Sequence, residues 1–266
     1  MLETEPTYSF SRITTFEQCA RRFRYRYHDG VKEAFKSIEA FMGQQVHSAI
    51  EWLFNEREQR PAHSLEEAIA YYCACWDRAM ATADPVVKVI KQRDTVAAQH
   101  RQGAELLAAF FRRVFTTDRL ETEANEKHFT ISLDGTHRFQ GFIDRVARDS
   151  DGLLYIIDYK TGKRRSKGFT GKDAEQLASY AVATFAETDE DEIELVIEYL
   201  RTQQRETRRI TRGEAASVES SLVKRIRELE SSTVFPPQSG ILCNWCGYND
   251  ICDASDLSLN ERRMAG

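Results

Sequence analysis

Residues 141–160 have the sequence GFIDRVARDSDGLLYIIDYK. Two largely apolar stretches, each containing an aspartate, flank the turn-forming residues Asp149-Ser150-Asp151-Gly152. This pattern predicts a β-hairpin, because strand-forming residues bounded by Asp and Gly favour paired strands and a turn. A second turn is expected at Asp134-Gly135. The predicted strands cover residues 126–133, 137–147 and 153–159.

The chain on either side of these strands has a helical pattern. Apolar residues recur every three or four positions over residues 41–118, which Pro61 and Asp84-Pro85 divide into separate helices. Residues 8–28 predict another helix, capped by Ser11 or Thr14, and Thr14-x-x-Glu17 has the form of a capping box. After the hairpin we expect a helix over 174–186, a strand over 193–200 and a helix over 214–230. The fold class is therefore α/β, with a central mixed β-sheet flanked by helices.

Composition limits the class of protein. The chain has 266 residues, 41% of them hydrophobic, and a net charge of −5. This balance argues against a nucleic-acid binder that is basic over its whole surface, so any such contact must use local basic patches. No apolar run approaches the roughly 20 residues that cross a bilayer, and Met1 to Phe10 lacks the apolar region of a signal peptide. We expect a soluble, cytoplasmic protein without a membrane partner.

The hairpin carries two carboxylates and an amine. Asp158 and Lys160 share a face of their strand because side chains alternate, and Tyr159 faces the other way. If the hairpin pairs in a register centred on Ser150, Asp144 lies on the same face, one diagonal step from Asp158. Such oxygen ligands suit Mg²⁺ or Mn²⁺. The alternative is a surface hairpin with ordinary acids, but Asp158 follows the apolar run LLYII, which is unusual for a surface strand.

Two predicted helices contribute further candidates. His47 lies in GQQVH, and an imidazole is a common ligand of transition metals, although a lone helical histidine is more often structural. Gln176 and Tyr180 are four residues apart and share a helix face. Either residue could contact a nucleotide or a catalytic water, or simply belong to the helix surface.

The C-terminal region contains a cysteine motif. Cys243, Cys246 and Cys252 form C-x₂-C-x₅-C, and Cys19 is the natural fourth ligand. Clustered cysteines in a reduced compartment favour metal over disulfides. Four thiolates suit either Zn²⁺ or an iron–sulfur cluster, and spacing alone does not separate the two.

The ordered motifs Gly43-x-x-x-His47, Gly141-x-x-Asp144, Asp158-x-Lys160-Thr161-Gly162 and Gln176-x-x-x-Tyr180 resemble the RecB-type branch of the PD-(D/E)XK nuclease superfamily. The resemblance implies a restriction-endonuclease-like core. It implies that His47, Asp144, Asp158 and the Tyr159 carbonyl bind the catalytic metal. It also implies that Lys160 is catalytic and that Gln176 and Tyr180 complete the site.

The cysteines are similar to those of the AddB nuclease domain and of CRISPR-associated RecB-like exonucleases, which implies a [4Fe–4S] cluster on Cys19, Cys243, Cys246 and Cys252. Ala20 follows Cys19 where that group often has proline. The division that we expect within the single nuclease domain, 1–266, is an N-terminal segment (1–40), a helical region (41–118), a nuclease core (119–235) and an iron–sulfur module (236–266).

Two basic segments are candidates for DNA contact. Residues 160–172 contain six lysines and arginines, which suits phosphate binding: Lys160, Lys163, Arg164, Arg165, Lys167 and Lys172. Residues 21–27 mix arginines with aromatic rings, a combination suited to single-stranded DNA, although Phe23 and Tyr27 are expected to be buried.

These observations favour a metal-dependent DNA exonuclease acting on single-stranded ends in repair, recombination or CRISPR adaptation. The alternative is a catalytically weak DNA-binding subunit of a larger helicase–nuclease or CRISPR complex. A third possibility, a zinc-dependent regulatory protein, explains the cysteines but not the hairpin. Partner proteins from repair or CRISPR systems are compatible with the sequence, and it leaves the oligomeric state open.

Overall fold

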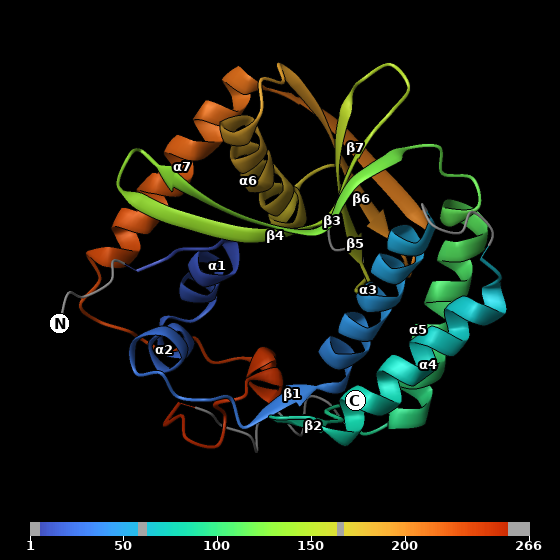
Figure 1. Cartoon of the computed structure of the whole chain (residues 1–266). Coiled ribbons are helices and arrows are strands. Elements are labelled where there is room, and N and C mark those ends of the chain that lie inside the picture. Colours follow the sequence, from blue (N-terminus) through green and yellow to red (C-terminus); the bar gives the residue numbers. More distant parts are fainter. Residues whose placement is uncertain (1–5, 58–62, 164–167, 255–266) are drawn as a thin grey trace.

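The computed structural model describes residues 6–57, 63–163 and 168–254, and its centre is a five-stranded sheet in the order β3-β4-β5-β6-β7 (Figure 1). β5 and β6 pair in parallel, and the other neighbours are antiparallel. The expected mixed α/β fold is thereby confirmed. The strands are β3 (Glu121–Leu133), β4 (His137–Arg148), β5 (Leu154–Lys160), β6 (Glu192–Tyr199) and β7 (Gln204–Thr211).

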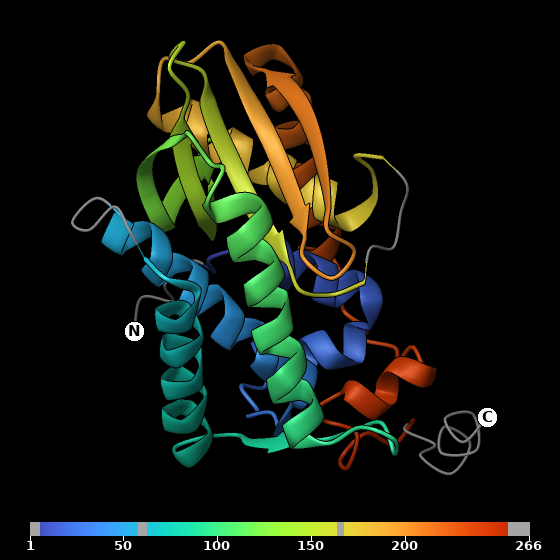
Figure 2. The same ribbon diagram turned by 90° about the vertical axis from the view of Figure 1, so that its right-hand side faces the viewer.

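Helices cover both faces of the sheet (Figure 2). One buried cluster joins one face to α6 (Gly171–Glu187) and α7 (Arg212–Glu230). A second cluster joins the other face to α3 (Ile38–Arg57), α4 (Leu65–Ala81) and α5 (Val96–Phe110), which continues into the π-helix η2 (Phe111–Phe115). No helix in the described ranges is both long and apolar enough to span a membrane.

The turn between β4 and β5 sets the register of the central hairpin. The Asp149 side chain accepts hydrogen bonds from the backbone N–H groups of Asp151 and Leu153, at 3.0 and 2.9 Å. Arg145 pairs with Ile157, so the hairpin centres on Asp151. The register centred on Ser150 was therefore wrong by one residue. The paired residues end at Arg145 and Ile157, so continuing this register by one residue would set Asp144 opposite Asp158 rather than on its diagonal.

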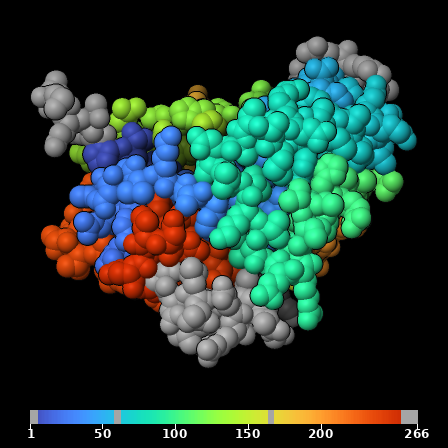
Figure 3. All heavy atoms as spheres, turned by 90° about the horizontal axis from the view of Figure 1, so that it is seen from below, coloured from blue at the N-terminus to red at the C-terminus, as the bar shows by residue number. Residues whose placement is uncertain are grey.

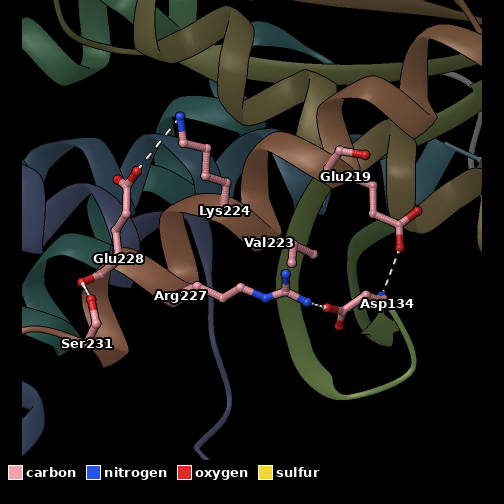
Figure 4. A pocket seen from close by; sticks show the side chains of 8 residues that line it. Asp134, Glu219, Val223, Lys224, Arg227, Glu228 and Ser231 are labelled. Atoms are coloured by element: carbon pink, nitrogen blue, oxygen red, sulfur yellow. Dashed lines mark hydrogen bonds and ion pairs between the residues drawn. The ribbon is translucent and has the colours of Figure 1, made fainter.

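The tip of the β3–β4 hairpin is fixed on α7 beside a shallow hollow (Figure 4). Asp134 and Gly135 have positive φ, as the predicted turn requires. Arg227 forms an ion pair with the Asp134 carboxylate at 2.8 Å, and Glu219 accepts a hydrogen bond from the Asp134 backbone N–H at 3.1 Å. The charged side chains of this hollow thus join the hairpin to the helix.

The N-terminal helix begins later than residue 8 and is interrupted. α1 (Phe10–Gln18) is capped by Ser9, whose hydroxyl accepts from the Arg12 N–H, so neither Ser11 nor Thr14 is the cap. Thr14 instead donates to the Phe10 carbonyl within the helix. Extended backbone at Cys19 ends α1, and the chain continues as α2 (Ala20–Phe23) and the π-helix η1 (Arg24–His28).

Three strands lie outside the predictions. β1 (Phe35–Ser37) and β2 (Val86–Lys88) form a small parallel sheet, and β2 lies within the run that was expected to be helical. β7 is an edge strand in which Ile210 is the one fully buried residue. Its charged sequence QRETRRIT hides the alternation by which a strand is recognised.

Candidate active site

Three side chains, from α3, β3 and β4, come together near the middle of the β3–β4 pair, where the backbone of both strands is kinked. His47 on α3, Glu126 on β3 and Asp144 on β4 each offer one ligand atom, and these atoms all lie within 4.8 Å of one another. His47 Nδ1 is 3.4 Å from Asp144 Oδ2, which also accepts a hydrogen bond from the Tyr159 N–H at 2.8 Å. One imidazole and two carboxylates form a donor set that suits Mn²⁺ and, through the oxygens, Mg²⁺.

A close approach of α3 brings His47 to the site. A Cβ atom built on Gly43 would lie 2.8 Å from Thr161 Oγ1, inside van der Waals contact. A Cβ at this position would therefore require the Thr161 side chain or this turn of α3 to shift, and glycine avoids the contact. His47 is one helical turn further on, which explains the spacing Gly43-x-x-x-His47.

A second chain of contacts runs from β5 to α6. Lys160 Nζ lies 3.0 Å from Asp158 Oδ1 and 2.8 Å from its Oδ2, and donates to Gln176 Oε1 at 2.8 Å. Gln176 Nε2 in turn donates to the Tyr180 hydroxyl at 2.6 Å. The amine is thereby held between a carboxylate and an amide that is itself oriented by a phenol.

Burial and proximity shift the protonation of these groups. Burial raises the pKa of Asp158 to about 6, with the nearby Asp144 adding to the effect and Lys160 opposing it. For His47, burial lowers the pKa, but the Asp144 carboxylate outweighs burial and raises it to about 9. Burial also lowers the pKa of Lys160, and the Asp158 carboxylate reverses this, so the amine keeps its proton. Without a metal, the positive charges of the His47 imidazolium and the Lys160 ammonium offset the negative charge of the carboxylates in the site.

Glu126 was missed at the sequence level. It lies within a polar stretch, ETEANEKHF, in which no acid stands out. Its φ of +44° is unusual for a residue with a side chain, and burial together with Asp144 raises its pKa to about 7. The one signal that could have identified Glu126 as a site residue is its position across the β3–β4 hairpin from Asp144.

The two strand aspartates have different surroundings. Asp144 lies with His47 and Glu126, whereas Asp158 contacts Lys160 and is outside the three-residue group. The Tyr159 ring lies on the face of β5 opposite Asp158, as expected, and packs between Phe54 and Phe110, with its centroid 6.4 Å from that of the His47 ring. Its backbone N–H, however, faces the site through Asp144. Asp144 and Asp158 are therefore linked through the Tyr159 peptide as well as by the hairpin.

The model of the PD-(D/E)XK nuclease superfamily matches residues 7–253. The chain belongs to this superfamily. Members use divalent metal ions, and the group formed by His47, Glu126 and Asp144 is a possible site for one.

Shorter matches connect the nuclease to curated proteins. An ATP-dependent helicase/deoxyribonuclease subunit from Streptococcus agalactiae is 32% identical over 81 residues, which cover 29% of this chain and 8% of the relative. The protein of the same name from Streptococcus mutans is 43% identical over 44 residues, 16% of this chain and 4% of the relative. The nuclease thus spans less than a tenth of these relatives. The crystal structure of SSO0001 covers 96% of this chain and 89% of its own, with a TM-score of 0.40 and 16% identity.

All four cysteines singled out from the sequence lie around one small hollow between the two ends of the nuclease. It is lined by Cys19 at the end of α1 and by Cys243, Cys246 and Cys252, of which Cys243 lies in the 3₁₀ helix η3 (Ile241–Trp245). The C-terminal segment lies beside the N-terminal one on the surface (Figure 3). Backbone hydrogen bonds join them, from Ala34 N–H to the Gly247 carbonyl and from Arg21 N–H to the Pro236 carbonyl.

The basic segments differ in their surroundings. Lys160, Lys163 and Lys172 line a groove of about 600 Å³ that also contains Gln176 and Tyr180, whereas Arg164, Arg165 and Lys167 lie outside the described residues. In residues 21–27 the side chains are engaged within the protein. Ion pairs join Arg21 to Asp253, Arg22 to Glu33 and Arg24 to Asp29, and Phe23 is buried.

Proposed function

We propose that this chain is a DNA nuclease that removes nucleotides from single-stranded ends by hydrolysing phosphodiester bonds. The observation that carries the proposal is the position of Lys160, which bridges Asp158 and Gln176 next to the group of His47, Glu126 and Asp144. A protein that only binds DNA has no need for a buried amine beside these acids, because such an arrangement is costly to build.

The proposed roles follow from the donor atoms. His47, Asp144, Asp158 and the Tyr159 carbonyl bind Mg²⁺ or Mn²⁺, with Glu126 beside them. A divalent ion held there would supply the Lewis acidity that polarises a phosphate oxygen and acidifies a water molecule. Lys160 donates to the oxygen on which negative charge develops, and Gln176 and Tyr180 hold the amine in place. His47 would have to release its proton before the imidazole could bind the ion.

DNA as the substrate is supported by two observations. In the part of the chain that the structure describes, neither Lys163 nor Lys172 forms an ion pair, and both line the groove that leads to Lys160. The curated relatives carry deoxyribonuclease in their names. Their names also include helicase, and we propose that the chain acts with a helicase or with other repair or CRISPR proteins.

Cleavage of oligonucleotides tests the proposal. Single-stranded and duplex DNA, labelled at the 5′ or the 3′ end, are incubated with Mg²⁺, with Mn²⁺ or with a chelator. We expect stepwise shortening of the single strand with either metal and none with the chelator. Asp158→Asn and Lys160→Ala are expected to abolish cleavage while leaving DNA binding largely intact. Lys160→Ala is also expected to lower the melting temperature, because it leaves the buried Asp158 carboxylate without its ammonium partner. Lys224→Ala, a change of an exposed lysine on α7, is the matched control.

Two outcomes decide against parts of the proposal. Internal fragments from a circular single strand indicate an endonuclease instead. No cleavage with any metal, together with unchanged DNA binding, indicates the catalytically weak DNA-binding subunit.

We further propose that Cys19, Cys243, Cys246 and Cys252 bind a [4Fe–4S] cluster that joins the chain ends. The four residues line one hollow, and Gln238 N–H lies 3.4 Å from Cys19 Sγ. Four thiolates suit either Zn²⁺ or an iron–sulfur cluster. The resemblance of the cysteine motif to those of iron–sulfur nucleases favours the cluster.

Metal analysis distinguishes the cluster from zinc. Protein purified without oxygen is expected to contain about four iron atoms per chain and to absorb broadly in the visible range. A Cys243→Ser variant is expected to lose both. One zinc per chain and no visible absorption would rule the cluster out while leaving the nuclease proposal untouched.

A further inference from the structure

Phe142 leaves an aromatic ring exposed next to the active site. The residue is 55% exposed, and Phe142 is the one aromatic residue among the exposed large hydrophobic residues of the described chain. It lies on β4 two residues before Asp144, about 7 Å along an extended strand. An apolar ring held open to water at this position points to a ligand that covers it.

A second ring lies beside it. His128 on β3 is the register partner of Phe142, and both residues are exposed. The ring centroids are 4.8 Å apart, with an angle of 44° between the planes. The pair therefore forms a two-ring surface on neighbouring strands, fixed by the sheet rather than by a flexible loop.

The groove connects this surface to the proposed chemistry. Phe142 lines the same groove as Lys160, Lys163 and Lys172, and the groove continues to Gln176 on α6. Lysines outnumber acids along it, although the whole chain carries a net charge of −5. A ligand that fits must offer a flat apolar face and a negative charge within one repeating unit.

We propose that Phe142, supported by His128, stacks on a base of single-stranded DNA and positions the neighbouring phosphate at Asp144. The inference rests on the proposed nuclease function and adds the structural feature that selects its substrate. Bases inside a duplex are stacked on one another, so their faces are covered and only a single strand or a frayed end can offer one. Phe142 is a positioning residue, since it touches the base and not the phosphate that reacts.

Binding without cleavage tests the inference. Fluorescence anisotropy with labelled single-stranded and blunt duplex DNA in EDTA gives the two dissociation constants. Phe142→Ala is expected to weaken single-strand binding by about 5- to 150-fold, which corresponds to the 1–3 kcal/mol of one stacked base. Duplex binding is expected to stay unchanged, and Phe142→Trp to keep single-strand affinity. Val86→Ala removes an exposed apolar side chain on β2 and serves as the control.

Oligonucleotides with a single abasic site provide the second measurement. Moving the abasic site along the strand is expected to weaken wild-type binding at one position, by a factor similar to that of Phe142→Ala. The variant itself is expected to be insensitive at that position, because the lost base and the lost ring belong to one contact. The fluorescence of the Phe142→Trp variant is expected to be quenched by single-stranded DNA.

Several results would overturn the inference. The first is an unchanged affinity of Phe142→Ala for single-stranded DNA. The second is a loss of duplex affinity as large as the loss of single-strand affinity. The third is an abasic site that weakens binding to Phe142→Ala as much as it weakens binding to the wild type. An unchanged affinity would assign the exposed ring to another occupant, such as a protein partner. All these measurements are independent of cleavage, so an inactive enzyme with a stacking-dependent affinity contradicts the proposed function but not this inference.

Discussion

Glu126 on β3 lies opposite Asp144 on β4, at the point where both strands lose their regular alternation of faces. Asn125 pairs with Arg145 and Lys127 with Ile143, which leaves Glu126 and Asp144 as the intervening positions. Ile143 and Val146 both pack in the cluster with α6, although a spacing of three puts residues on opposite faces of a regular strand. The kink therefore turns both carboxylates toward α3 and His47.

The strained backbone of Glu126 leads to a prediction about the stability and the metal affinity of two variants at this position. At a φ of +44°, glycine avoids the strain that costs an L-residue roughly 1–2 kcal/mol. We expect Glu126→Gly to be about 1 kcal/mol more stable than Glu126→Ala without metal. Both variants are expected to bind Mn²⁺ about 10- to 100-fold more weakly than wild type. Urea unfolding and calorimetric titration measure the two effects. Wild-type Mn²⁺ affinity in either variant would exclude Glu126 from the metal site.

The contact between Gly43 and Thr161 makes a second prediction. Gly43→Ala places a Cβ 2.8 Å from Thr161 Oγ1, so either the Thr161 side chain or this turn of α3 must shift. We expect Mn²⁺ affinity and cleavage to fall about 10-fold or more, because His47 moves with the helix. Adding Thr161→Ala removes the obstructing hydroxyl and is expected to restore most of the loss. A double variant as weak as the single one would show that the close approach does not position His47.

The pH dependence of metal binding follows from Glu126. Its pKa is raised to about 7 by burial first and by Asp144 second, against an unfolded value of about 4.3. Between these values the folded, metal-free protein holds a proton that the unfolded chain has lost, so its stability falls as pH rises through this window. A divalent ion replaces that proton.

We therefore expect the gain in melting temperature on adding Mn²⁺ to grow from about pH 6 to about pH 8, on either side of this pKa. His47 acts in the same direction, since the imidazole must also release its proton to bind a metal. Thermal unfolding with Mn²⁺ and with EDTA at each pH measures the difference. Glu126→Gln is expected to flatten the dependence, and a gain that shrinks as pH rises would contradict the account.

Arg145, the neighbour of Asp144, has a structural role. It is fully buried, donates to both oxygens of Asp118 at 2.9 and 3.0 Å, and lies 3.7 Å from the centre of the Phe54 ring. Arg145→Ala leaves the buried Asp118 carboxylate with less positive charge beside it. We expect this variant to lose about 3–5 kcal/mol of folding stability. Replacing both partners, with Arg145→Met and Asp118→Leu, is expected to cost less than the single change. Chemical denaturation distinguishes these outcomes, and a loss below about 1 kcal/mol would refute the structural role.

The central hairpins were predictable because local chemistry specifies them. Alternating residues and the Asp-Gly turns mark β3, β4 and β5, and the apolar period marks α6. The register was missed by one residue because the Asp149 side chain, rather than the spacing alone, shapes the turn. The kink that turns Asp144 toward α3 and His47 has no counterpart in the sequence pattern, so the surroundings of Asp144 could not be predicted from strand alternation.

The remaining features depend on tertiary context. Glu126 carries no local mark, because its importance lies in a backbone kink and in the residue across the sheet. β7 is an edge strand whose pairing with β6 outweighs its polar sequence. The division of the chain at residues 40, 118 and 235 stays a prediction, and so do the individual roles of the site residues.

The cluster that we propose on Cys19, Cys243, Cys246 and Cys252 gives the final prediction. Cys19 and Cys243 enclose roughly 220 residues, and a crosslink that closes so long a loop stabilises a fold by several kcal/mol. We expect Cys243→Ser to lower the melting temperature and to expose the segment after Pro236 to limited proteolysis. Cys75→Ser on α4, outside the hollow, is expected to change neither. An unchanged melting temperature in protein that has lost its metal would show that the chain ends are held by packing alone.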